Sequence, residues 1–459
     1  MTRLDCRTSD PDSSIWVDPS EDTFRRHLVQ LEECTNAVPV DPQVFPLQED
    51  SNVSPHTLPL ALEQQLADDL DFLAAIEEGA QSVAAVCLEE HAKGLTIRFA
   101  ALDLVLSGEV KNALEHIIHV MSLSAHASDS AASEALFDDI VKLHVRRLLA
   151  RLRSDKWEKP KYLSKQHKKP LWRDFSNMIH RVQFLYTKKE AAARQSVEVQ
   201  LQSLATVYEA FESLEANSAA EFDYLKELIR ASYRLCKDKE VAEFAQRLEA
   251  SPSSTPTAKV ASAIKCLRQI EKIASYARIA RSLIDLSHSY PSLFRNKMQL
   301  AFLTPFKSVS TEIGYEAWAT TCHVHAEVQL AVFYDLLSQS SHTMEAELDS
   351  FNTDFRRPRV IGTSKWLCYL CHLFLSCHGG FVPANTHGRL YDQWTVPDLI
   401  DYQPELRARY RRILRTMDGK VLQEIKNTVS AGADEPGYVR WRAEPMTSRQ
   451  NLLGVDNAH

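Results

Sequence analysis

Apolar residues recur at helical spacing through most of the first 286 positions of the chain. The clearest run consists of Leu62, Leu66, Leu70, Leu73 and Ile76. The same period returns within residues 175–186, 197–211 and 260–270. Side chains three and four positions apart share one face of a helix, and a protein core buries such an apolar face. Residues 59–286 are therefore predicted to form an all-helical domain.

The amino-terminal segment, residues 1–58, is rich in serine, acidic residues and proline. Its prolines are Pro11, Pro19, Pro39, Pro42, Pro46 and Pro55. Trp16 and Phe24 are isolated apolar anchors within it. Proline interrupts regular structure, and a polar segment buries too little apolar surface to offset its ordering entropy. The pattern predicts a mostly disordered tail.

Beyond Pro291 the apolar runs become shorter and are separated by turns. One run covers residues 298–303, and another covers residues 359–361, between Pro358 and Gly362. Short apolar runs bounded by turn residues indicate strands, and strands that alternate with helices form an α/β layer. The predicted fold class is α+β overall, in which the all-helical half is followed by an α/β domain over residues 287–430. A carboxy-terminal tail covers residues 431–459.

Composition narrows the class of protein. The chain has 459 residues, of which 44% are hydrophobic and 25% charged, which is typical of globular proteins and long enough for more than one domain. The 9 cysteines are odd in number and scattered, unlike a disulfide framework. Neither a signal core nor an apolar run of the ~18 residues that a spanning helix needs is present. We expect a soluble intracellular protein, cytoplasmic or nuclear, with no membrane partner.

Net charge bears on possible partners. The formal charge is −8 at pH 7, which argues against a protein that binds nucleic acid over its whole surface. One segment departs from this balance, since residues 146–173 carry eleven lysines and arginines interleaved with Trp157, Tyr162 and Trp172. Basic and aromatic side chains together are typical of RNA or single-strand surfaces. The alternative is a solvated helix end whose tryptophans anchor onto the helical array.

A second basic run lies near the end of the chain. It consists of Arg407, Arg409, Arg411, Arg412 and Arg415. These positions are spread around a predicted helix and do not share one face. The spacing predicts a solvated surface.

The residues with the most specific chemistry are His325, Glu327, Cys368 and Cys371. One imidazole and two thiolates hold a zinc ion and leave a fourth position for water, whose pKa zinc lowers to about 7. Cys368 and Cys371 are three residues apart at the start of a predicted helix, where they share a face and the helix dipole favours thiolates. H-x-E followed by C-x-x-C is the signature of zinc nucleobase deaminases, in which the Glu carries protons.

Other interpretations of these residues remain. The pair His323 and His325 suits an isopeptidase-type zinc site, but the Ser and Asp that it requires fall on Phe333 and Leu336, so that interpretation fails. The cysteines and histidine could also be ordinary core residues. A closed structural zinc would need a fourth protein ligand. The candidates for that ligand are Cys322, His323, His372, Cys377 and His387.

Three ordered blocks of the sequence resemble the fungal nucleic acid/nucleotide deaminase-like family, a branch of the cytidine deaminase superfamily. They are residues 323–330, residues 361–371, and residues 386–391 with Trp394. The resemblance implies a mixed β-sheet flanked by helices. It also implies that His325, Cys368 and Cys371 bind zinc, and that Glu327 is the acid/base of a hydrolytic deamination of a nucleobase in a nucleotide or nucleic acid.

The sequence departs from the superfamily pattern at Leu367, where many members have proline before the first cysteine. The residue that contacts the substrate upstream cannot be located by motif, and Asn296 is the candidate. His387 and Trp394 could line a base pocket, because aromatic and imidazole faces stack on extruded bases. The alternative is that the aromatic residues pack the sheet and His387 bonds to a loop.

Two other functions therefore stay open beside the deaminase. The protein could be a non-catalytic interaction protein in which zinc is structural and the helical half binds a partner. It could also be an RNA-binding protein whose function lies in residues 146–173. The sequence does not predict the oligomeric state.

Overall fold

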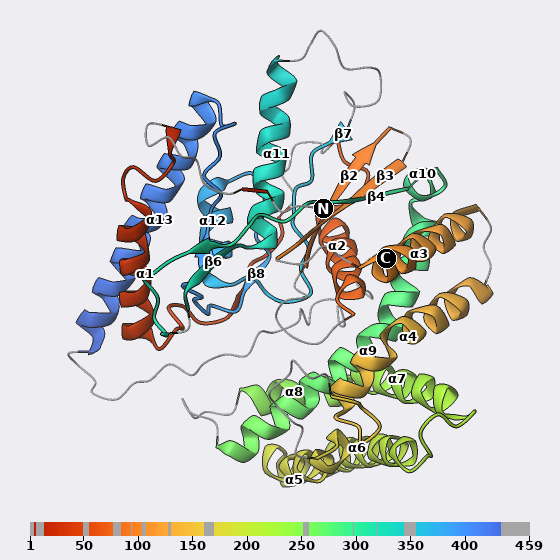
Figure 1. The fold of residues 1–459 in the computed structure, drawn as a ribbon. Helices are drawn as coiled ribbons and strands as arrows, with labels where there is room; N and C mark the ends of the chain where they lie inside the picture. Colours follow the sequence, from red (N-terminus) through yellow and green to blue (C-terminus); the bar gives the residue numbers. More distant parts are fainter. Residues whose placement is uncertain are drawn as a thin grey trace. The chain divides into compact units, whose positions relative to one another are not determined.

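The computed structural model describes residues 4–5, 13–48, 55–76, 84–92, 94–102, 107–126, 130–159, 169–250, 257–296, 298–317, 319–343 and 355–432. These residues belong to two compact units (Figure 1). We call them the helical unit, which is mainly Leu123–Ser289, and the sheet unit, which combines Met1–Ala75, Ala80–Ser122 and Tyr290–Ser448. The sheet unit is therefore assembled from both ends of the chain.

The helical unit is built around its longest helix, α9, which packs against α4, α5, α7 and α8. Its α-helices are α4 (Ser130–Leu152), α5 (Phe175–Leu185), α6 (Ala191–Glu212), α7 (Glu221–Lys237), α8 (Lys239–Glu249) and α9 (Ala258–Ser289), joined in part by the 3-10 helices η2 (Leu171–Asp174) and η3 (Lys188–Glu190). The apolar stripe of α6 is buried along its length, from Val197 to Phe211. The helical prediction is confirmed for this unit.

The sheet unit contains a four-stranded mixed sheet of order β4-β3-β2-β7. Its strands are β2 (Ala84–His91), β3 (Gly94–Ala101), β4 (Gln299–Phe302) and β7 (Phe355–Arg356). β2 pairs antiparallel with β3 and β7, and β3 pairs parallel with β4. Helices α2 (Leu60–Ala74) and α11 (Ala326–Thr343) both contact β2, which explains why seven of its eight residues are buried.

Strands β2 and β3 lie in a range for which only helices were predicted, so that part of the helical assignment is wrong. A short continuous apolar run does not reveal by its period whether it is a buried strand or a buried helix segment. Here the two runs form a hairpin from Ala84↔Ala101 to His91↔Gly94, and helices cover it. The hairpin also removes residues 84–101 from the predicted helical domain and places them in the sheet unit.

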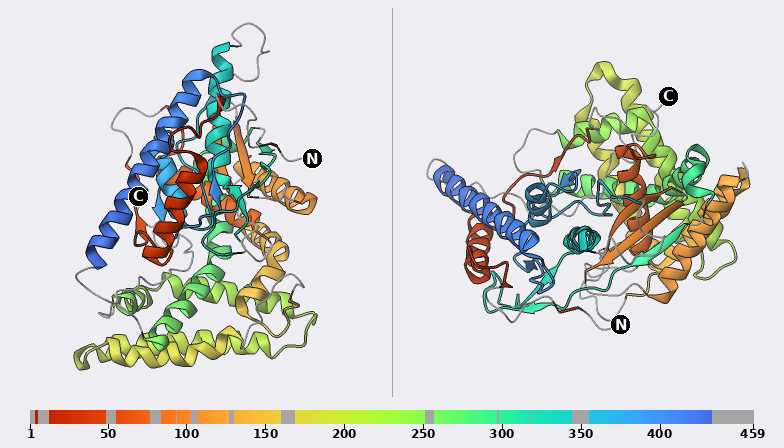
Figure 2. Two further views of the ribbon diagram at one scale, coloured as in Figure 1. Left: turned by 60° about the vertical axis from the view of Figure 1, so that its left-hand side comes forward. Right: turned by 90° about the horizontal axis from the view of Figure 1, so that it is seen from above.

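Two smaller sheets complete the unit. One has the order β5-β6-β9 and consists of β5 (Val309–Ser310), β6 (Thr321–Val324) and β9 (Trp394–Thr395). The other pairs β1 (Gln43–Val44) with β8 (Asn385–Thr386). Seen from above, α11 lies between the four-stranded sheet and α12 (Tyr369–His378) (Figure 2). The predicted fold class, with a helical part and an α/β domain of mixed sheets and flanking helices, is confirmed.

The amino-terminal segment is ordered where the structure describes it, so the prediction of a mostly disordered tail is wrong for residues 13–48. Helix α1 (Glu21–Thr35) has Ser20 as its N-cap, and the Ser20 hydroxyl accepts a hydrogen bond from the Thr23 backbone at 3.2 Å. Its buried residues include Phe24, Leu28 and Leu31, and it packs against α13 (Pro404–Gly432) (Figure 1). This short apolar face is surrounded by proline-rich sequence, which obscured its helical period.

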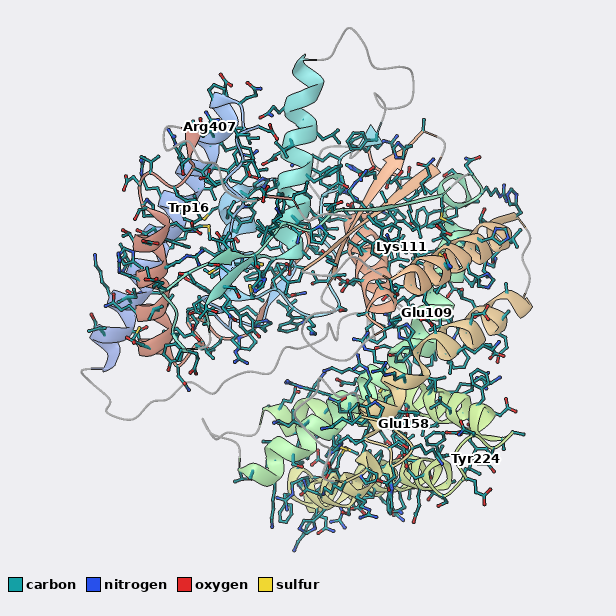
Figure 3. The ribbon with its side chains drawn as sticks, viewed as in Figure 1. Trp16, Glu109, Lys111, Glu158, Tyr224 and Arg407 are labelled. Carbon is teal, nitrogen blue, oxygen red and sulfur yellow. The ribbon has the colours of Figure 1, made fainter. Side chains whose placement is uncertain are left out.

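The second basic run is the predicted solvated surface only at Arg412 and Arg415, which are exposed, while its other three arginines are partly buried. Arg409 contacts the buried Asp335 at 3.3 Å, and Arg411 donates to the backbone oxygen of Ser14 at 2.6 and 2.9 Å. Arg407, which Figure 3 labels in the region of α13, donates to the Tyr402 oxygen at 2.7 Å. These arginines instead tie α13 to neighbouring segments.

Helix α3 (Gly108–His126) and the short α10 (Pro291–Phe294) complete the description of the helices. Lys111 of α3 lies over the Phe302 ring of β4, with Nζ 4.6 Å from the ring centroid. Among the described residues, no helix is both long enough and apolar enough to cross a bilayer.

Candidate metal centre

The predicted zinc ligands meet at one point of the sheet unit. His325 Nδ1 lies 3.6 Å from Cys368 Sγ and 3.3 Å from Cys371 Sγ. One donor atom from each residue lies within 4.8 Å of the others. In a tetrahedral zinc site with Zn–N near 2.1 Å and Zn–S near 2.3 Å, nitrogen and sulfur ligands are about 3.5 Å apart. The number, chemistry and spacing of these donors therefore fit zinc.

Local structure explains how the three donors converge. His325 lies between the end of β6 and the start of α11. Cys368 is the N-cap of α12, and its Sγ accepts a hydrogen bond from the Cys371 backbone at 3.3 Å. Unpaired N–H groups at the start of a helix favour negative charge on the sulfur. Both halves of the cluster therefore lie at helix starts, as the sequence predicted.

The two thiols divide their charge unequally. Burial raises the pKa of Cys368, but hydrogen bonds from Cys371 and His325 and the His325 charge outweigh it, so the pKa is well below its usual range. Burial and the neighbouring Cys368 thiolate hold the pKa of Cys371 well above its usual range. A low-pKa thiolate is the form that binds metal, and a metal would displace the remaining proton.

Glu327 lies beside the cluster in the first turn of α11. Its side chain is buried, and Oε2 accepts a hydrogen bond from the Cys371 thiol at 3.5 Å. Burial raises the pKa of Glu327, while the charge of His325 acts in the opposite direction. The arrangement holds a carboxyl group next to the candidate ligands, as a proton carrier requires.

His387 lies in the loop that follows β8, where its backbone and its ring both bond to neighbouring backbone groups. It is 3% exposed, its backbone donates to the Leu367 oxygen at 3.0 Å, and its Nδ1 accepts from the Arg389 backbone at 3.0 Å. Burial lowers its pKa to about 4, so the ring is neutral at physiological pH. The interpretation in which His387 bonds to a loop describes these contacts.

Trp394, a candidate for the base pocket, is buried next to the metal cluster, where its side chain acts to lower the pKa of Cys371. Trp394 is 1% exposed and packs between Phe374 and Phe24, at ring centroid distances of 5.9 and 6.5 Å. It therefore belongs to the core, as the packing alternative expected. Asn296 is exposed just after α10 and donates locally to the Ser292 oxygen at 3.2 Å. The structure does not bring it to the metal cluster.

The candidates for a fourth protein ligand have other contacts. Arg25 donates a hydrogen bond to Cys322, and the His372 ring stacks on Phe45 at a centroid distance of 4.7 Å. Cys377 has a side-chain hydrogen bond with Lys420, which acts to lower the pKa of the thiol. Within the described part of the chain, the metal-binding group contains His325, Cys368 and Cys371, without a fourth His, Cys, Asp or Glu. A three-donor group is the ligand number of a catalytic zinc site, whereas a structural site has four protein ligands.

Several supporting residues were missed in the sequence. The buried Gln329 side chain donates to the oxygens of Ala101 and Val324, both at 2.9 Å, which joins the start of α11 to β3. The Leu367 backbone donates to Asn385 Oδ1 at 3.2 Å. A proline at position 367 would lose this bond, because proline has no N–H. No short motif could reveal these supports, since each joins distant parts of the chain.

The basic segment lies in the helical unit, and residues 160–168 of it, including Tyr162, fall outside the described part of the chain. Arg153 and Lys169 form ion pairs with Asp174, at 2.6 and 2.5 Å. Lys156 donates a hydrogen bond to the Leu214 oxygen. These three cations therefore contact groups within the helical unit.

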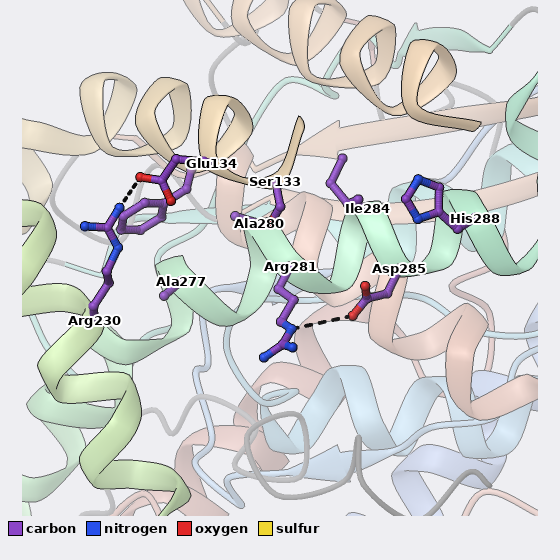
Figure 4. Close-up of a pocket in the computed structure, with 10 residues that line it drawn as sticks. Ser133, Glu134, Arg230, Ala277, Ala280, Arg281, Ile284, Asp285 and His288 are labelled. Atoms are coloured by element: carbon purple, nitrogen blue, oxygen red, sulfur yellow. Dashed lines mark hydrogen bonds and ion pairs between the residues drawn. The ribbon is translucent and has the colours of Figure 1, made fainter. Parts of the chain in front are cut away.

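A separate hollow of about 680 Å³ lies in the helical unit between α4, α7 and α9 (Figure 4). Phe137, Ala280 and Ile284 contribute apolar surface to it. Its charged side chains are already paired, since Arg230 contacts Glu134 and Arg281 lies 4.0 Å from Asp285. The hollow is therefore lined by apolar side chains and by charged side chains that already pair with each other. None of the residues that line it belongs to the metal cluster.

Comparison with known families places the metal cluster in a matched region. Residues 324–398 match a family model described as OTT_1508-like deaminase. The match begins one residue before His325 and includes both cysteines and Glu327, so it supports a deaminase family for this region. No curated protein and no solved structure matches the chain.

Proposed function

We propose that the protein is a zinc-dependent hydrolytic deaminase that acts on a nucleobase, either in a free nucleotide or in single-stranded nucleic acid. The observation that carries this proposal is the meeting of His325, Cys368 and Cys371 beside the buried carboxyl of Glu327. All four residues lie in the region that matches a deaminase family. A thiolate and imidazole donor set suits zinc better than the harder cations.

In this proposal His325, Cys368 and Cys371 hold the zinc ion. Bound zinc supplies Lewis acidity, which lowers the pKa of a coordinated water from 15.7 to about 7. The backbone bonds of Leu367 to Asn385 and His387 keep Cys368 in place. Gln329 does the same for the helix that follows His325.

Glu327 performs the proton transfers. Deamination adds water to the ring carbon that carries the amino group, breaks the carbon–nitrogen bond and releases ammonia. Glu327 takes one proton from the attacking water and delivers it to the ring nitrogen, and it then takes the second proton from the added hydroxyl group and delivers it to the leaving amino nitrogen. Its place in the first turn of α11, two residues after His325, holds the carboxyl group beside the metal ligands.

The experiment compares wild type with Glu327→Gln, which keeps the size of the side chain and removes its acid/base function. Zinc content is measured on both proteins, and ammonia release is screened with nucleosides, nucleotides, single-stranded DNA and RNA. We expect about one zinc per chain in both proteins and a loss of activity of about 10²–10⁴-fold in the variant.

Three results would contradict the proposal. Purified wild-type protein that contains no zinc would contradict the assignment of the metal site. Full ammonia release by Glu327→Gln would contradict the assignment of Glu327 as the proton carrier. Stoichiometric zinc without deamination of any base would instead indicate a structural zinc in a non-catalytic protein.

A further inference from the structure

Helix α2 buries four acidic side chains far from the metal ligands in the sequence. They are Glu63, Asp68, Asp69 and Asp71, which are 1%, 6%, 1% and 0% exposed. Burying a carboxyl group costs free energy unless hydrogen bonds or opposite charges compensate. The partners of these acids therefore indicate what the helix does.

Three of the acids bind one short stretch of chain, residues 359–364, which we call the cysteine approach. Glu63 accepts from the backbone and the Nε of Arg359 at 2.8 and 2.7 Å. Asp68 Oδ1 accepts from the Thr363 backbone at 2.7 Å, and Asp71 Oδ2 accepts from the Ser364 backbone. The bonds to Thr363 and Ser364 hold the main chain itself and not a mobile side chain.

The cysteine approach is also held by β2, which lies beside α2 in Figure 1. Val86 exchanges two backbone hydrogen bonds with Gly362, at 2.9 and 2.8 Å. A Cβ atom at Gly362 would lie 2.3 Å from the backbone carbon of Ala67 in α2. The main chain reaches α2 this closely because position 362 has no side chain.

The cysteine approach leads directly into the metal centre. Ser364 is followed four residues later by Cys368, the N-cap of α12. So short a connection transmits a displacement of the Thr363 and Ser364 backbone to the Cys368 sulfur. Supporting hydrogen bonds of this kind orient metal ligands, and their loss lowers metal affinity by about 10–100-fold.

We propose that Asp68 and Asp71 are positioning residues of the metal centre, which set the place of Cys368 through the backbone of Thr363 and Ser364. The effect on catalysis rests on the function proposed above, whereas the effect on metal affinity does not. Residues 60–74 lie outside the region that matches the deaminase family, so this support belongs to the wider unit.

The test uses full-length protein and measures zinc affinity by competition with a chromophoric chelator. Asp68→Ala and Asp71→Ala remove the acceptors, whereas Asp68→Asn keeps a carbonyl acceptor. Burial raises the pKa of Asp68 to about 8, so asparagine also reproduces its mostly uncharged state at neutral pH. We expect the alanine variants to lose about 10–100-fold in zinc affinity and Asp68→Asn to restore it.

A matched glycine pair tests the same geometry without changing an acid. Gly362→Ala pushes the cysteine approach away from α2, while Gly108→Ala adds a methyl group that meets nothing within 4 Å. We expect weaker zinc binding only for Gly362→Ala. Cobalt(II) replaces zinc as a spectroscopic probe, and displaced cysteines should reduce its thiolate charge-transfer absorption. Should an alanine variant lose its far-UV circular dichroism, the glycine pair decides the question.

Folded Asp68→Ala and Asp71→Ala proteins with wild-type zinc affinity and a wild-type cobalt spectrum would overturn the proposal. So would an Asp68→Asn protein as weak in zinc binding as Asp68→Ala. If wild-type protein binds zinc and releases no ammonia, the proposed deaminase function is contradicted. The comparison of zinc affinities still decides whether α2 positions the metal centre.

Discussion

Asp335 shows how much of the order in the sheet unit depends on a single buried charge. It is 3% exposed and accepts hydrogen bonds from Arg357, His378 and Tyr410, at 2.9, 2.8 and 3.1 Å. Arg409 contacts the same carboxylate at 3.3 Å. The partners come from the end of α12, from α13 and from the segment after β7. One carboxylate on α11 thus joins three separate parts of the unit.

We predict that Asp335→Asn destabilises the sheet unit at neutral pH by about 1.5–3 kcal/mol, because Arg357 and Arg409, whose side chains are about a third exposed, lose the charge of the carboxylate that they contact. Burial raises the pKa of Asp335, but its partners outweigh burial and lower the pKa to about 2. A lowered pKa in the folded state gives stability that is present above about pH 4 and is lost as the pH falls toward 2.

The measurement is urea unfolding of metal-free wild type and Asp335→Asn between pH 7 and pH 2. The difference in unfolding free energy should be largest at pH 7 and should shrink below pH 4. A difference that stays constant over this range would show that the charge of Asp335 is not its source.

At the scale of elements, the amino-terminal segment contacts two segments next to the candidate metal ligands. β1 pairs with β8, and Phe45 stacks on His372, the residue after Cys371. The Leu390 backbone donates to the Ala37 oxygen at 2.9 Å. The loop of residues 385–391, which supports Cys368, is therefore itself held by residues 37–45.

A substitution at Gly388 tests whether residues 37–45 support the loop of residues 385–391. Its φ of +71° favours glycine, and a Cβ there would lie 1.8 Å from the Val40 oxygen. Gly379 is the matched control, since its φ is +69° and a Cβ would meet nothing within 4 Å. We predict that Gly379→Ala costs about 1–2 kcal/mol from backbone strain alone. Gly388→Ala should cost clearly more and should also weaken zinc binding.

Thermal unfolding and zinc competition are measured on both variants. The comparison separates the effect of the steric contact with Val40 from the effect of backbone strain at a positive φ. Equal loss of stability in both variants, with zinc affinity unchanged, would mean that the amino-terminal segment does not support the metal centre.

The whole sheet unit is assembled from stretches far apart in the sequence. Residues 324–398 match a deaminase family, yet Gln329 bonds to β3 and Gly362 bonds to β2, both of which lie more than 200 residues earlier. Without β2, β3 and α2, the matched region would expose apolar faces of α11 and unpaired backbone groups.

We therefore predict that a fragment of residues 324–398 neither unfolds cooperatively nor binds zinc with the affinity of the full chain. Coexpression of residues 1–122 with residues 290–448 should restore zinc binding, since together they contain the sheet unit. Calorimetry and zinc titration provide the comparison. A short fragment with full zinc affinity would show that the distant elements are dispensable for the metal site.

The sequence alone was sufficient to predict the candidate ligands and Glu327. Each half of the site is a short motif at a helix start, and local spacing determines which side chains share a helix face. The stripes of the helical unit were predictable for the same reason, because a long amphipathic helix carries its own period.

Only the tertiary structure decided how the two halves of the metal centre are held. Asp68, Asp71, Gln329 and Gly362 are ordinary residues in sequence, and their partners lie at separations that no local period encodes. The same holds for the amino-terminal helix and the hairpin of β2 and β3, which become regular structure by burying surface against distant elements. Long-range packing and backbone hydrogen bonds therefore determine the precision of a site whose chemistry was already visible in the sequence.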